Sequence, residues 1–171
     1  MAQDINNFAV TNWVSIPAPW PVAQPPAPGD QKWLIILSGV AIIDFKGINS
    51  DDWRWETFRL IIPDLKDAIQ ASGKKAPKGS ALYFQVEQWA PYATLNAIFD
   101  KDHSVNAGFA VDNYRPVFQV LSDSKGVKFH NIFSCLEVDA AVRDSDAWIF
   151  RIGYNVTLMG KILTIKLPPI E

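Results

Sequence analysis

Apolar and polar residues alternate with a period of two through most of this chain, a pattern that predicts β-strands. Residues 33–45 form a nearly continuous apolar run, which is typical of a strand covered on both faces. Gly39 in the middle of this run predicts a bulge or bend that splits the strand. The further strands that we predict cover residues 53–62, 81–89, 92–99, 105–111, 117–121, 132–142, 148–158 and 162–167.

The segment 53–62 changes its alternation part-way. Its apolar residues occupy odd positions at Trp53 and Trp55, and even positions from Phe58 onward. Either a bulge near residues 56–57 or an outward-facing Trp pair would produce this change.

Turn-forming residues separate the predicted strands. Pro91 is expected to break one strand because proline has no backbone donor, and Gly160 is expected to turn the chain into the last strand. Residues 113–116 predict a turn and residues 122–126 a loop. Residues 143–146 give the strongest hairpin signal, which would pair the strands on either side.

One short helix is predicted over residues 64–72. Leu65, Ala68 and Ile69 fall on one helical face, and Gly73 follows as a stop signal. One helix and about eight to ten strands joined by hairpins predict an all-β fold with antiparallel sheets. We expect a jelly-roll-like β-sandwich, with closure into a barrel as the alternative.

The N-terminal segment departs most from ordinary globular composition. Residues 17–28 hold six of the twelve prolines of the chain, so this stretch must run extended. Trp13 and Trp20 are expected to anchor it on apolar surface, either of its own domain or of a neighbouring subunit. The chain therefore divides into an extended arm, residues 1–32, and a single domain, residues 33–171.

Charge and composition exclude several classes of function. Nucleic-acid binding needs a concentrated basic face, whereas this chain has a formal net charge of −2 and dispersed basic residues, so we expect no nucleic-acid partner. The single cysteine, Cys135, allows no internal disulfide. A catalytic role for His103 or His130 would need positioned partners, which spacing alone does not show. We expect no catalytic residues and no cofactor. The N-terminus carries no signal-peptide pattern, so a cytoplasmic protein, or one released without a signal peptide, is expected.

Aromatic residues supply the candidate binding site. Trp and Tyr at strand ends can stack on sugar faces or settle at a membrane interface, because each joins a flat apolar ring to one polar group. The candidate ligand-binding residues are Trp53, Arg54, Trp55, Trp89 and Tyr92.

Acidic turns provide only a weak candidate for a metal site. Carboxylates on loops suit Ca²⁺, yet Asp is also favoured in turns because its side chain caps its own backbone. We therefore predict no metal, with a weak calcium alternative at Asp100, Asp102, Asp144 and Asp146.

Three functions follow from these observations, in descending order of support. The first is a non-enzymatic, self-assembling β-sandwich, a homo-oligomer subunit with a lectin-like aromatic surface for carbohydrate. The second is a membrane-active, pore-forming or toxin-like sandwich. The third is a small barrel-like or cupin-like enzyme.

Overall fold

The structure is a computed structural model, and it describes residues 3–5, 8–18, 31–48, 52–62, 64–100, 108–143 and 145–168. Most of these residues lie in strands, and the predicted helix is present. The elements are β1 (Gln3–Ile5), β2 (Phe8–Pro17), β3 (Lys32–Ile48), β4 (Arg54–Leu60), α1 (Asp64–Ala71), β5 (Ser80–Asp100), β6 (Gly108–Ser122), β7 (Lys128–Arg143) and β8 (Ser145–Lys166).

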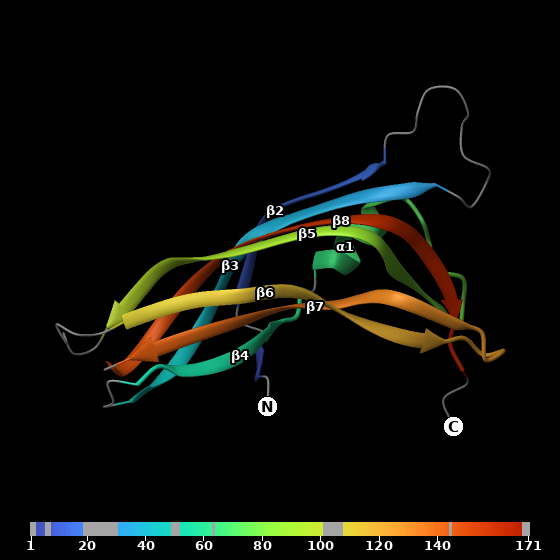
Figure 1. Cartoon of the computed structure of the whole chain (residues 1–171). Coiled ribbons are helices and arrows are strands. Elements are labelled where there is room, and N and C mark those ends of the chain that lie inside the picture. Colours follow the sequence, from blue (N-terminus) through green and yellow to red (C-terminus); the bar gives the residue numbers. More distant parts are fainter. Residues whose placement is uncertain are drawn as a thin grey trace.

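The strands form two layers with α1 between them (Figure 1). The upper layer contains β2, β3, β8 and β5 in that order, and every pair is antiparallel. The lower layer contains β1, β4, β7 and β6; here β1 runs parallel to β4, and the other pairs are antiparallel. The layers join where Gln85 of β5 pairs with Ile132 of β7. The all-β, antiparallel class is confirmed, whereas the jelly-roll and sandwich descriptions stay predictions.

One hydrophobic core fills the space between the layers. Inward-facing residues of both layers and of α1 belong to it, which follows from the period-two burial along the strands. Helix α1 contributes Leu65, Ala68 and Ile69 to this core, and these are the residues of its predicted apolar face. Gly73 has φ 78°, a left-handed conformation that ends the helix. Within the described residues, no helix has the length and apolar character needed to cross a bilayer.

Strand β3 is continuous through Gly39, so the predicted split is wrong. Its register with β8 runs without a shift across Gly39, which pairs with Tyr154. The irregularity lies instead in the edge strand β2, between Val10 and Asn12, opposite Gly39 and Ser38. An edge strand can hold an extra residue because only one of its sides is paired.

The pairing of strand β4 decides between the two explanations for the changed alternation at Trp53 and Trp55. Its register with β7 is unbroken from Arg54 opposite Val142 to Leu60 opposite Leu136, so no bulge occurs. Trp53 and Trp55 are 42% and 48% exposed, so the outward-facing Trp pair is the correct alternative.

Two positions at which we predicted a strand to end lie inside strands instead. Strand β5 passes through Pro91, which pairs with Val156, so the predicted break there is wrong. Proline is tolerated because β5 pairs with β8 alone at this point. Strand β6 likewise continues through residues 113–116, where the predicted turn is a bulge with Asn113 at φ 49°.

The predicted hairpin at residues 143–146 is also wrong. Strand β7 ends at Arg143 and β8 begins at Ser145, yet the two strands do not pair with each other. Strand β7 belongs to the lower layer and β8 to the upper one, so the chain changes layers here (Figure 1). Gly160 makes no turn either, because β8 continues through it. The predicted loop at residues 122–126 is confirmed.

The described part of the arm contributes strands to both layers. Residues 8–17 form β2, which pairs with β3 of the same chain, and Trp13 lies opposite Leu37 in that register. Residues 3–5 form β1 beside β4. Trp20 lies outside the described residues, so its anchoring function stays a prediction.

Candidate functional site

The outer face of the lower layer brings together side chains from three neighbouring strands. In antiparallel pairing, directly opposite residues share a face, so the register of β4, β7 and β6 defines rows across this face. Even-numbered residues of β7 from 136 to 142 are buried in the core, which turns the odd-numbered ones outward. The rows are Trp55–Ala141–Ala110, Thr57–Asp139–Asp112 and Arg59–Glu137–Arg115.

Trp53 and Trp55 form a pair of indoles at one end of this face, which we call the indole platform. Their ring centroids are 6.4 Å apart and their planes are inclined by 34°. The guanidinium carbon of Arg143 lies 5.2 Å from the Trp53 ring centroid, a distance at which a cation is attracted to the ring face. Both indoles stay about half exposed, so the platform can receive a flat ligand.

Gly108 allows the Trp53 ring to lie close to the sheet. A Cβ at this position would lie 2.8 Å from Cη2 of Trp53 and 3.3 Å from Nε of Arg143. Every other residue type would therefore push the ring or the guanidinium away. Gly108 pairs with Arg143, so both residues of one cross-strand pair lie against the Trp53 ring.

Acidic and hydroxyl groups follow the indoles in the next row. Thr57 donates its hydroxyl to Oδ1 of Asp139 at 2.7 Å. Asp112 lies opposite Asp139 and accepts the backbone N–H of Asn113 at 2.7 Å. A carboxylate has several lone-pair positions, so both groups keep acceptor capacity after these contacts.

The third row of this face consists of a buried carboxylate between two arginines. Glu137 is 8% exposed, Arg59 Nε lies 3.4 Å from its Oε2, and Arg115 pairs with its Oε1. The two guanidiniums compensate the cost of burying this charge. On β4, β7 and β6 the acids Asp112, Asp139 and Glu137 equal in number the bases Arg59, Arg115 and Arg143, so these six formal charges cancel.

Trp89 and Tyr92 lie elsewhere, on β5. Trp89 meets Phe118 edge-on at 5.1 Å between centroids, and Tyr92 meets Tyr114 in the same manner at 5.7 Å. Phe118 and Tyr114 pack against the core, so they face inward from β6. The structure therefore separates the sequence-predicted aromatics into the indole platform and a second pair, Trp89 and Tyr92, that bridges the two layers.

Arg54 does not join the platform. It lies between the two tryptophans in sequence and so on the opposite face of β4, where it forms an ion pair with Glu56.

The weak metal candidates add no site within the described residues. Asp102 and Asp144 lie outside them, as does His103; Asp100 ends β5 and Asp146 lies in β8. The described residues contain no group of three or more potential metal ligands. His130 is exposed on β7, and Cys135 is buried.

Sequence reasoning missed the polar part of the outer face. Thr57, Asp112, Asp139 and Arg143 come from three strands, and only the register shows that they are neighbours. One signal was available, since Glu137 and Asp139 interrupt an otherwise apolar strand at alternate positions. Charges at such positions indicate an outward face with polar partners.

Comparisons with protein-family models, with curated proteins and with solved structures found no match for this chain.

Proposed function

We propose that this protein is a non-catalytic carbohydrate-binding module and that the outer face of β4, β7 and β6 holds the sugar. The observation that carries this proposal is the indole platform, whose Trp53 ring lies against Gly108 and Arg143, beside a row of carboxylates. The platform and the row come from consecutive outward positions of the same strands, so they lie about 7 Å apart.

The chemistry of a sugar matches this arrangement. A pyranose ring has an apolar C–H face that stacks on an indole, and hydroxyl donors around its edge. The carboxylates of Asp112 and Asp139 can accept those hydroxyls, and charged acceptors form the stronger hydrogen bonds. Because the six formal charges of β4, β7 and β6 on this face cancel, an uncharged sugar suits it better than a charged one.

Binding fits this face better than hydrolysis does. Trp55 and Arg115 are largely exposed, so water reaches the face freely. Glycosidases use water as a reactant, but they also hold one carboxylic acid in a shielded apolar pocket so that it can donate a proton to the leaving oxygen, whereas Asp112 is exposed here. The large cavity among the described residues lies elsewhere, beside α1.

The test is a glycan array followed by calorimetric titration with the best neutral glycan. We expect Trp53→Ala and Trp55→Ala each to weaken binding by roughly tenfold or more, because each removes half of the stacking surface. Trp89→Ala and Tyr92→Ala are matched controls, since these residues are equally exposed aromatics on another edge.

Two outcomes would contradict the proposal. One is an array on which no glycan binds, and the other is a glycan whose affinity falls in the β5 variants but not in the platform variants. Release of dye from vesicles by the wild-type protein, with no glycan bound, would favour the membrane-active alternative instead.

A second proposal concerns self-association. Among the described strands, β2 is the outermost one of the upper layer, and its Val14 and Ile16 are 39% and 43% exposed. An unpaired strand edge with apolar side chains is a template for a second chain. We propose that two copies associate along β2 to form a homo-oligomer.

A further inference from the structure

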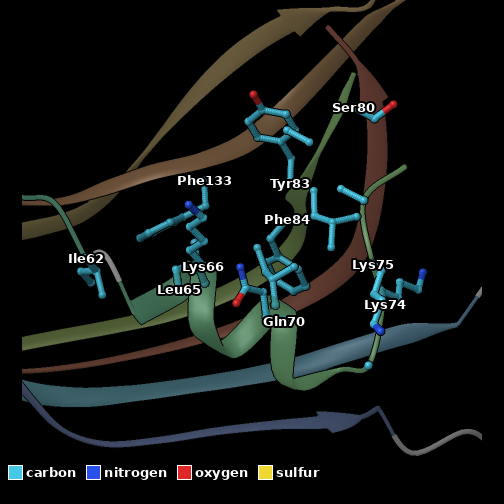
Figure 2. A pocket seen from close by; sticks show the side chains of 15 residues that line it. Ile62, Leu65, Lys66, Gln70, Lys74, Lys75, Ser80, Tyr83, Phe84 and Phe133 are labelled. Atoms are coloured by element: carbon cyan, nitrogen blue, oxygen red, sulfur yellow. The ribbon is translucent and has the colours of Figure 1, made fainter. Parts of the chain in front are cut away.

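A cavity of about 870 Å³ lies beside α1, near the junction of the two layers. Its lining comes from α1, from the loop after it, from the start of β5 and from Phe133 at the start of β7 (Figure 2). The size falls within the range of pockets that enclose most of a small ligand. The volume is distinct from the outer face, because Phe84 and Phe133 belong to the core.

The deep part of this cavity is apolar. Ile69, Phe84 and Phe133 line it, and each is at most 6% exposed. Such a surface gains free energy by covering methylene groups, and the gain rises with each methylene that is removed from water.

The polar part of the lining combines three lysines with the neutral residues Gln70, Ser80 and Tyr83. Lys66 rises from α1 beside Phe133, and Lys74 and Lys75 follow on the loop after the helix (Figure 2). The Nζ of Lys74 donates to the carbonyl of Ile162 at 3.2 Å, which leaves further ammonium protons for a ligand. Among the lining residues that the structure describes, none is Asp or Glu. An apolar cavity with ammonium groups among its described lining residues complements a ligand with one apolar chain and one anionic end.

We propose that this cavity binds a free long-chain carboxylate of the fatty-acid type, with its chain against Phe84 and Phe133 and its carboxylate at the end of the cavity where Lys74 and Lys75 lie (Figure 2). A charge-assisted hydrogen bond between ammonium and carboxylate fixes the polar end. The site is independent of the sugar face, since the two share no residue.

The experiment is calorimetric titration of the full chain with decanoate, dodecanoate and dodecanol, each below its micellar concentration. We expect one site, and about tenfold tighter binding of dodecanoate than of decanoate, because two more methylenes are buried. Dodecanol should bind at least tenfold more weakly than dodecanoate. Saturating dodecanoate should also raise the Tm.

Two variants locate the site. The combined Lys66→Gln, Lys74→Gln and Lys75→Gln variant should bind dodecanoate at least tenfold more weakly and bind dodecanol as the wild type does. Ala76→Trp places a large ring at the lining from an exposed loop position, so it should block both ligands without changing the Tm of the free protein. Lys125→Gln combined with Lys128→Gln is the control, because those exposed lysines lie at the β6–β7 loop.

Three results would overturn the proposal: equal affinity for dodecanol and dodecanoate, unchanged binding in both pocket variants, or binding only to micelles or to phosphatidylcholine vesicles. None of these depends on the glycan result, so the two proposals fail separately.

Discussion

Gly160 illustrates how strongly a single residue constrains this fold. A Cβ at this position of β8 would lie 1.9 Å from the backbone carbonyl oxygen of Gln85 and 2.9 Å from its carbonyl carbon. Strand β5 has a register shift between Val86 and Gln88, immediately after this contact. The close approach of two backbones, rather than a turn, is therefore what requires glycine here.

We expect Gly160→Ala to destabilise the protein by about 3 kcal/mol or more, because the atoms in the way are backbone and cannot rotate aside. Urea unfolding followed by circular dichroism measures this loss. Gly108→Ala is the matched control: its Cβ would meet the side chains of Trp53 and Arg143, which can move. It should cost about 1 kcal/mol and change the Trp fluorescence. Equal stability of wild type and Gly160→Ala would show that β5 and β8 do not pack as described.

At the scale of elements, the β6–β7 hairpin depends on one carboxylate. Asp123 Oδ1 accepts the backbone N–H of Lys125 at 2.8 Å and that of Val127 at 2.9 Å. Gly126 follows with φ 77°, a left-handed conformation that glycine adopts at little cost. The Asp123 side chain and the Gly126 backbone therefore favour the same turn geometry.

We predict that Asp123→Ala lowers the free energy of unfolding by about 1.5 kcal/mol, because both amide donors lose a charged acceptor. Ser124→Ala, at the exposed position beside it, should leave stability within about 0.5 kcal/mol of the wild type. Thermal and urea unfolding of the three proteins make the comparison. A larger loss for Ser124→Ala than for Asp123→Ala would contradict this account of the hairpin.

A comparison of this hairpin with the connection at residues 143–146 shows which elements could be predicted from the sequence. Helix α1 and the loop at residues 122–126 are determined by neighbouring residues, so propensity and turn chemistry identify them. The connection at residues 143–146 has equally good local turn chemistry, yet β7 and β8 pair with other strands. Pairing depends on the partners available in each layer, and these are distant in sequence. The candidate site divides in the same way: the tryptophans stand out locally, whereas Asp139 and Arg143 join them only through register.

At the scale of the whole molecule, no strand among the described residues pairs with the outer side of β2. Strand β3 is largely protected by β8 on one side and β2 on the other, so β2 is the exposed edge of the upper layer. Proteins often protect such edges with charged side chains, and here Val14 and Ile16 are exposed instead. A partner strand would cover them, which is the physical basis for proposing association at this edge.

We expect light scattering of the intact chain to give a mass above that of one 19.1 kDa chain at micromolar concentration. Ile16→Lys should return the protein to monomer, because a charge on the edge strand opposes edge-to-edge pairing while the exposed position leaves the fold unchanged. Val127→Lys is the matched control, since Val127 is 51% exposed in a loop away from β2; its mass should equal that of the wild type. A monomeric intact chain would contradict self-association altogether. An oligomer that persists in Ile16→Lys and dissociates in Val127→Lys would place the interface at the β6–β7 loop instead of β2.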